Sequence, residues 1–206
     1  MNPVQVLLVN ACPRGSASRS LYLSDCLLRF LRNEGEIRLR THDLCRMELK
    51  PLDGPHLMER EALCNRHDFH GPLFAPARDL MECELLVIAA PYWDLSFPSV
   101  LKVWIEHMFV RNLTFVYRRN EPQGLCPVKH GVYLTTSGSP MNGMDFGFPY
   151  IREAMRFLGV PSMDVISAEG LDLEGARTEE ILQRAVEESR EWAIRYMKQR
   201  KSTPLD

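Results

Sequence analysis

Residues 85–117 read LLVIAAPYWDLSFPSVLKVWIEHMFVRNLTFVY, and this stretch decides the fold of the chain. It opens with a continuous apolar run, 85–90, which is typical of a strand buried on both faces. A loop with two aromatic residues and an acid follows, and Pro98 then favours a helix start, where its missing N–H costs little. From there apolar residues recur at helical spacing: Val100, Leu101, Trp104, Ile105, Met108 and Phe109. Residues 92–95 are therefore expected at the carboxyl end of a buried strand, where open α/β sheets bind ligands.

The rest of the chain repeats this alternation of strand and helix. Strands are expected at 4–9, 37–43, 131–135 and 163–168, and helices from 18–20 to 31 and at 75–82, 150–158 and 178–198. Residues 37–43 alternate in polarity, so that strand should lie nearer the sheet edge. The pattern predicts a single α/β domain over 1–206, a three-layer sandwich with helices on both faces of a five-stranded parallel sheet. The expected strand order is the flavodoxin-like 2-1-3-4-5, with a ligand crevice between strands 1 and 3.

Three segments interrupt this pattern. Residues 44–74 are rich in proline and glycine and are expected to be irregular apart from a short helix around 56–64, and loops of this length are uncommon unless they have a function. Residues 118–126 contain Pro122 and Gly124 and are predicted to form a turn. Residues 136–148 are predicted to be a glycine-rich loop, whose far part is either a lid over a substrate or a plain surface loop.

Composition excludes several classes of protein. A formal net charge of −2 with mixed signs gives no broad basic surface for nucleic acid. The six cysteines, at 12, 26, 45, 64, 83 and 126, form no CxxC pair, which favours reduced thiols in a cytoplasmic protein. There is no leader-like start, and no apolar run is long enough to span a membrane.

The loop after the first strand has the composition of a phosphate site. It precedes a helix, whose N-terminus offers free N–H donors and a partial positive charge. Ser16 and Ser18 add hydroxyl donors, with Ala17 between them, and Arg14 or Arg19 could pair with the anion. Serine is also favoured as a helix cap in a plain turn, and this alternative stays open.

Two further loops should reach the same edge of the sheet. The second would wall a flat ring with Tyr92 and Trp93 and read its polar edge with backbone groups, and it comprises Pro91, Tyr92, Trp93, Asp94 and Leu95. Asp94 is expected to turn back onto the N–H of Ser96 or Phe97 as an Asx turn. In the third loop, Thr136, Ser137, Gly138 and Ser139, the glycine allows close backbone approach. Together the three loops predict one pocket of mononucleotide size.

The chain resembles the NAD(P)H-dependent flavin oxidoreductases of flavodoxin-like fold, the azoreductase and quinone-reductase group. The resemblance rests on the strand ending in Ala-Pro, on Leu101-Lys102, on Ser16-Ala17-Ser18 and on Thr114-Phe115-Val116-Tyr117. It implies FMN as cofactor, NADH or NADPH as cosubstrate, and ping-pong reduction of a quinone, azo or flavin-like small-molecule acceptor. It also implies a homodimer with the active site at the interface, where residues 44–74 would cover the neighbour's flavin. The chain departs from the group's pattern at Asp94, where Asn is usual, and in the third loop, which lacks an Arg.

Flavin chemistry needs no dedicated nucleophile or metal, so no metal site is expected. Tyr150 and His130 are the candidate proton donors. One alternative is a cysteine-dependent phosphatase using Cys12 with Arg19, and another is a flavodoxin-type electron carrier. A zinc site at Cys64, His67 and His70 lacks a fourth ligand at motif spacing and is set aside.

Overall fold

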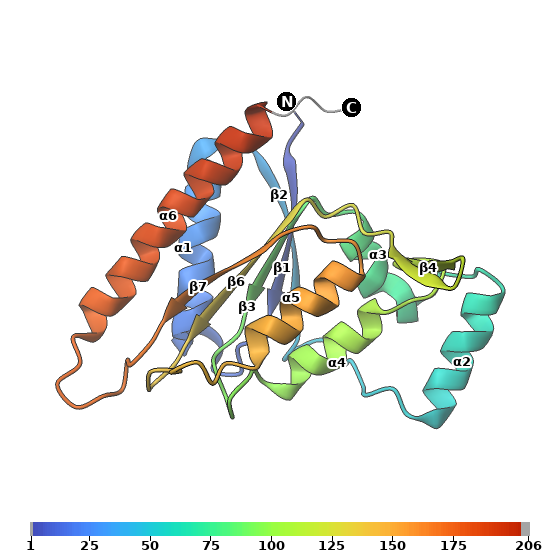
Figure 1. The fold of residues 1–206 in the computed structure, drawn as a ribbon, viewed down its shortest axis with the longest axis horizontal. Coiled ribbons are helices and arrows are strands. Elements are labelled where there is room, and N and C mark those ends of the chain that lie inside the picture. The colour runs from blue at the N-terminus through green and yellow to red at the C-terminus, as the bar shows by residue number, and fades with distance from the viewer. Residues whose placement is uncertain (1, 203–206) are drawn as a thin grey trace.

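Strand β3 (Leu85–Ala89) lies at the centre of the sheet and is buried along its whole length, as its apolar sequence predicts. The computed structural model describes residues 2–202, so residue 1 and residues 203–206 of the predicted domain lie outside the described part. The sheet is five-stranded and parallel in the order β2-β1-β3-β6-β7 (Figure 1), which confirms the predicted flavodoxin-like order. The other elements are β1 (Val4–Asn10), α1 (Arg19–Glu34), β2 (Ile37–Asp43), α2 (Gly54–Asn65), α3 (Ala75–Met81), α4 (Ser99–Met108), β4 (Phe115–Arg118), β5 (Glu121–Gly124), β6 (His130–Thr136), α5 (Gly147–Phe157), β7 (Met163–Ala168) and α6 (Thr178–Ser202), with short 3-10 turns at Gly15–Ala17 and Pro72–Phe74.

Helices cover both faces of the sheet, as predicted. On one face α1 and α6 lie side by side (Figure 1), and Leu8 of β1 packs with Leu27 of α1. On the other face α3, α4 and α5 pack on a second core that contains Leu7 and Trp104. Neighbouring residues Leu7 and Leu8 thus point to opposite faces, as the period of a strand requires. Each fully buried side chain of this size stabilises the fold by roughly 1.5–3 kcal/mol.

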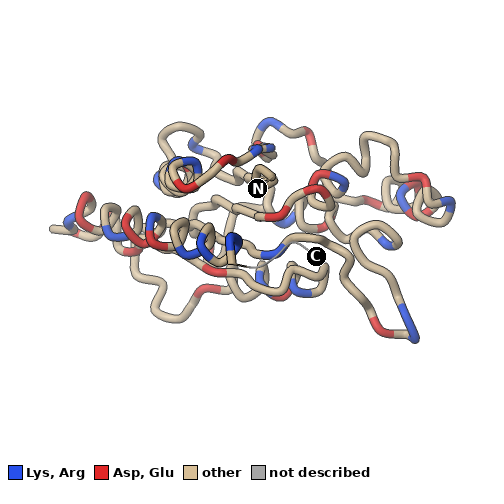
Figure 2. The backbone as a smooth tube through the Cα atoms, turned by 90° about the horizontal axis from the view of Figure 1, so that it is seen from above, with Lys and Arg blue, Asp and Glu red and all other residues tan. Residues whose placement is uncertain are grey.

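Strand β2 forms one edge of the sheet, and residues 38–41 are exposed, which confirms its predicted place. Acidic and basic residues are interspersed along the backbone (Figure 2), in keeping with the net charge of −2. Among residues 2–202, no helix has the length and apolar character needed to cross a membrane.

The prediction of a turn over 118–126 is wrong, because β4 and β5 form an antiparallel hairpin with Phe115 opposite Gly124. The turn itself is only Arg119 and Asn120, with φ of 52° and 66°, as two-residue hairpin turns require. The sequence EPQG of β5 has little strand propensity, so the pairing is imposed by packing. A Cβ on Gly124 would lie 2.1 Å from the Gly159 nitrogen, so the hairpin approaches the end of α5 backbone to backbone.

Capping side chains set the helix starts. Ser18 caps α1, where its hydroxyl accepts the Leu21 N–H at 3.3 Å, so the helix starts where the sequence predicts. Asp53 caps α2 by accepting the His56 N–H at 3.0 Å, which confirms a short helix in the irregular segment. Helix α5 begins three residues earlier than predicted, at Gly147, because Asp145 Oδ1 accepts the Gly147 N–H at 2.7 Å.

Candidate functional site

A cleft of about 350 Å³ opens at the carboxyl ends of β1, β3 and β6, the lower edge of the sheet in Figure 1. The predicted three loops all contribute to it. Its lining comprises Pro13, Arg14, Ala17, Ser18, Arg19, Pro91, Tyr92, Trp93, Thr136, Ser137, Gly138 and Asp172. Four predicted residues are not part of this lining: Ser16, Asp94, Leu95 and Ser139. The structure therefore brings most of the predicted site together at one place.

The first loop presents a helix N-terminus to the cleft. Its 3-10 turn delivers the chain to Ser18, which is buried and accepts hydrogen bonds from Leu21 through its hydroxyl and from Tyr22 through its carbonyl, at 3.3 and 3.0 Å. The N–H groups of Arg19 and Ser20 precede these and have no intrahelical acceptor. The capping role of Ser18 is thus present, and it leaves two N–H donors at the helix end beside the cleft. Ser16 is exposed and is not part of the cleft lining.

Hydrogen bonds between the loops fix the floor of the cleft. The Ser20 hydroxyl is 2.8 Å from the Thr136 hydroxyl and joins α1 to the end of β6. The Tyr92 N–H donates to the Thr136 carbonyl at 3.0 Å, and the Ser137 N–H donates to the Ala168 carbonyl at 3.0 Å. These hydrogen bonds therefore join the start of α1, the second loop, the third loop and the end of β7 to one another.

The predicted Asx turn at Asp94 is wrong. Trp93 and Ser96 instead exchange backbone hydrogen bonds of 3.0 and 2.8 Å, which leaves Asp94 and Leu95 at the tip of a two-residue reverse turn. Both tip residues have positive φ, 50° and 66°. Asp94 is exposed and is not part of the cleft lining, whereas Trp93 lines the cleft and is 42% exposed.

The segment 141–146 packs against this second loop. The Tyr92 hydroxyl donates to the Met144 carbonyl at 2.9 Å, and the Phe146 N–H donates to the Leu95 carbonyl at 2.9 Å. The Phe146 side chain is 63% exposed, whereas Phe148 stacks on Tyr133 with ring centroids 6.3 Å apart. The glycine-rich loop is thus attached to the cleft rim by its backbone and presents an aromatic ring to solvent.

The third loop owes its shape to Gly138 and Asp172. The Asp172 N–H donates to the Gly138 carbonyl at 2.9 Å, and a Cβ on Gly138 would lie 2.6 Å from Asp172 Oδ2. Asp172 also accepts a hydrogen bond of 2.7 Å from the Arg19 guanidinium, across the mouth of the cleft. Sequence reasoning missed Asp172, since it follows β7 in an unremarkable turn and reaches the cleft only because β7 lies beside β6.

The two candidate proton donors lie elsewhere. His130 begins β6, at the opposite end of that strand from Thr136, and its Nε2 is 2.8 Å from Asp164 Oδ2. A strand of this length spans roughly 20 Å. His130 is therefore too far from the cleft to donate a proton there. Tyr150 lies in the first turn of α5, with its ring centroid 6.0 Å from that of Phe97 and 5.8 Å from Lys102 Nζ, outside the cleft lining.

Cys12 is unsuited to nucleophilic catalysis. Its thiol is buried and donates to the Ala89 carbonyl at 3.4 Å. Burial raises the pKa of Cys12 to about 11, so the reactive thiolate is scarce at neutral pH. Arg19, the expected partner of the thiolate, pairs with Asp172 instead. These contacts count against the phosphatase alternative.

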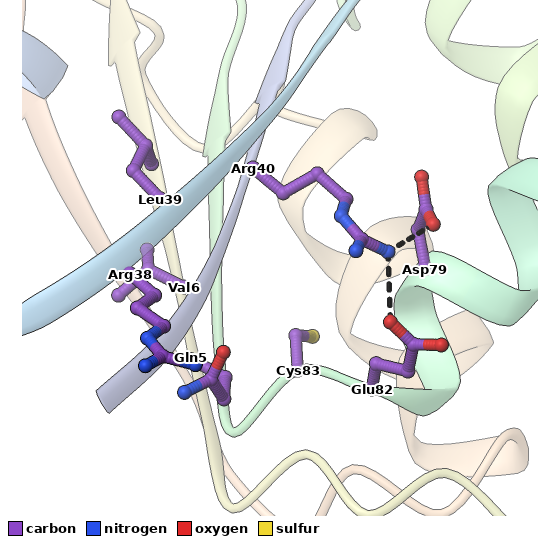
Figure 3. A pocket seen from close by; sticks show the side chains of 8 residues that line it. All are labelled: Gln5, Val6, Arg38, Leu39, Arg40, Asp79, Glu82 and Cys83. Atoms are coloured by element: carbon purple, nitrogen blue, oxygen red, sulfur yellow. Dashed lines mark hydrogen bonds and ion pairs between the residues drawn. The ribbon is translucent and has the colours of Figure 1, made fainter. Parts of the chain in front are cut away.

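A second hollow, of about 340 Å³, lies between the sheet edge and the end of α3 (Figure 3). Its two arginines, Arg38 and Arg40, are balanced by the carboxylates of Asp79 and Glu82, and the Arg40 guanidinium is paired with both. With that charge compensated, this hollow offers weaker recognition than the cleft. Across residues 2–202, no three His, Cys, Asp or Glu side chains are grouped to hold a metal ion.

Comparison with known proteins shows which family the chain matches. Residues 4–193 match the protein family described as flavodoxin-like fold. The chain is 31% identical to "FMN-dependent NADH:quinone oxidoreductase 2" of Clostridium acetobutylicum, over 94% of this chain and 98% of that protein. It is 32% identical to the FMN-dependent NADH:quinone oxidoreductase of Azotobacter vinelandii, over 91% and 97%. The crystal structure of an azoreductase from Bacillus anthracis superposes with a TM-score of 0.81 at 21% identity, covering 92% of this chain and 98% of that one.

Proposed function

The chain belongs to the flavodoxin-like family that includes the FMN-dependent NADH:quinone oxidoreductases, and we propose that it is an FMN-dependent NAD(P)H oxidoreductase that reduces quinone, azo or flavin-like small molecules. The observation that carries the proposal is the cleft, in which a helix N-terminus, two aromatic side chains and a glycine-containing loop converge. When bound, FMN would supply the redox chemistry, with NADH or NADPH as the electron donor.

The first loop fits the phosphate end of a mononucleotide. The free N–H groups of Arg19 and Ser20 would donate to phosphate oxygens, and the helix dipole favours the negative charge. Arg14 and Ser18 line the same end and add charged and hydroxyl donors. Ala17 keeps the approach open because its side chain is small. Ser16 would have to turn inward from its exposed position to take part.

The second and third loops fit a flat ring. Pro91, Tyr92 and Trp93 form one wall of the cleft, and Thr136, Ser137 and Gly138 form the other. The absent Cβ at Gly138 lets the backbone of the third loop come close to a ring edge. Backbone groups then replace the missing Arg contact. Asp94 is exposed at the turn tip, where water screens its charge from a reduced ring.

The open side of the cleft would receive the two substrates in turn. Its rim carries exposed apolar side chains, Trp93, Leu95, Met144 and Phe146, which suit flat aromatic molecules. We expect ping-pong kinetics, because donor and acceptor would share this side. We also propose a homodimer in which a second copy completes this side of the cleft. The described cysteines are all free thiols, which supports a reducing, cytoplasmic setting.

The test is flavin binding by absorbance, followed by anaerobic reduction. The wild-type chain should bind FMN, and the flavin band should bleach on addition of NADH. Gly138→Ala should weaken FMN binding several-fold, because the new methyl group would push aside the Asp172 carboxylate, which also lines the cleft. Gly71→Ala is the matched control, since a Cβ there meets nothing within 4 Å.

Two results would contradict the proposal. Equal FMN affinity of Gly138→Ala and Gly71→Ala would show that the third loop is not part of the FMN site. A bound flavin that NADH does not reduce would favour the electron-carrier alternative instead.

A further inference from the structure

A third hollow, of about 340 Å³, lies between α2 and the chain that leads from α4 into β4. In Figure 1 this region is on the side of the molecule away from α1 and α6. Helix α2 contributes Arg60, Glu61, Cys64 and Asn65, and the other wall consists of Phe109, Arg111 and Phe115. None of these residues lines the proposed flavin cleft, so the hollow is a separate site.

The hollow contains two guanidinium groups that bind neutral acceptors. Arg60 donates to the Glu106 main-chain carbonyl at 3.0 Å, and Arg111 donates to the side-chain oxygen of Asn65. The Glu106 carboxylate itself pairs with Lys102. Within residues 2–202, neither Arg60 nor Arg111 forms an ion pair with a carboxylate. Two positive charges therefore lie at this site without a bonded counter-charge.

Both guanidinium groups line this one hollow. Burial raises the pKa of the Cys64 thiol, and the positive charges of Arg60 and Arg111 both act in the opposite direction. Glu61 is the one carboxylate of the lining and works against them. The lining thus carries two positive charges and one negative charge, which leaves it net positive.

The opposite wall is aromatic and preformed. Phe115 is buried and Phe109 half-buried, with ring centroids 6.3 Å apart, and Phe157 lies 5.2 Å from each of them. The turn that carries these rings is fixed by Thr114, whose hydroxyl accepts the Val110 N–H at 3.0 Å and donates to the Met108 carbonyl at 2.6 Å. A flat apolar group could pack here without reorganising the wall.

We propose that this hollow binds a small aromatic carboxylate. The carboxylate would lie between Arg60 and Arg111, which can offer it charge-assisted hydrogen bonds. The ring would pack on Phe109 and Phe115, where edge and face contacts between rings are favourable. The volume lies within the usual range for small-molecule sites. The site is independent of the flavin cleft and holds whether or not the proposed oxidoreductase activity does.

The experiment is calorimetric titration of benzoate into the full chain in the presence of excess FMN, near pH 7.5 and at low salt. The wild type should bind benzoate saturably at one site per chain. Arg60→Gln and Arg111→Gln should each weaken binding by about tenfold, because each removes a charged hydrogen-bond donor. Glu61→Gln should strengthen binding, since it removes the one carboxylate of the lining. Benzyl alcohol, which has the same ring without the charge, should bind at least tenfold more weakly.

Arg184→Gln is the matched control, because Arg184 is an exposed arginine on α6 outside the hollow and its loss should leave benzoate affinity unchanged. Far-ultraviolet circular dichroism and flavin content check that each variant is folded. If Arg60→Gln does not fold, Arg111→Gln and Glu61→Gln decide the matter. Absence of saturable binding to the wild type, or equal affinity of the wild type and Arg111→Gln, would overturn the proposal.

Discussion

His42 is a buried side chain whose two ring nitrogens have different partners. Its Nδ1 accepts a hydrogen bond from Trp104 Nε1 at 3.0 Å, so the proton of the neutral ring is on Nε2, which lies 2.9 Å from Asp79 Oδ2. Burial lowers the pKa of His42, although Asp79 acts in the opposite direction. A second ring proton would also meet the Trp104 N–H head-on. The ring is therefore built to stay neutral and to link β2 to both α3 and α4.

We predict that this histidine makes the fold sensitive to acid. Because the folded-state pKa is lowered, the unfolded chain binds the proton first as the pH falls. The contribution of His42 is thus fully present above the ordinary histidine pKa of about 6.5 and is lost below it, toward the lowered folded value. Urea unfolding at pH 7.5 and 5.5 should show a larger loss of stability for the wild type than for His42→Gln. His70→Gln, at an exposed position, is the control. An equal pH dependence in all three proteins would contradict this role.

At the scale of elements, the sequence was most informative where local and tertiary preferences agree. The run 85–90 and the alternating 37–43 gave a central and an edge strand, because burial on two faces or on one leaves a different polarity pattern. The β4–β5 hairpin was missed because its pairing depends on contacts with the distant end of α5. Asp172 was missed for the same reason: it reaches the cleft through strand order, which no local pattern records.

The close packing of the hairpin against the end of α5 should make the protein intolerant of a side chain at Gly124. Gly124→Ala should destabilise the protein by about 2 kcal/mol or more, because its Cβ would lie 2.1 Å from the Leu158 carbonyl carbon and the Gly159 nitrogen. Backbone on both sides leaves no flexible side chain to move away. Gly71→Ala should be nearly neutral, because Gly71 is in an extended conformation that alanine adopts before proline and a Cβ there meets nothing within 4 Å. Chemical denaturation measures both changes, and equal midpoints for the two variants would show that the hairpin is free to shift.

In the whole molecule, the order of the strands in the sheet brings separate loops together into one site. It brings the ends of β1, β3 and β6 together, so nine of the thirteen residues expected at the cofactor line one cleft. The four others, Ser16, Asp94, Leu95 and Ser139, belong to the right loops but are exposed and are not part of the lining. Topology follows from the alternation of strands and helices, which the sequence shows plainly. Side-chain direction within a loop follows from turn geometry, such as the positive φ at Asp94, which the sequence shows poorly.

Exposed apolar side chains on α2 and on the β4–β5 hairpin indicate where the proposed homodimer would form its interface. Met58 on α2 is 73% exposed and Tyr117 on β4 is 57% exposed, and both lie on elements that extend beyond the sheet (Figure 1). We expect sedimentation velocity at micromolar concentration to show a dimer for the wild type and a shift to monomer for Met58→Asp and Tyr117→Asp, because a charge buried at an interface without a partner is strongly unfavourable. Tyr22→Asp, on α1 at the other face of the sheet, should leave the dimer intact. A monomeric wild type, or dissociation caused equally by Tyr22→Asp, would rule out α2 and the hairpin as the interface. The cleft would then have to bind both substrates within one chain.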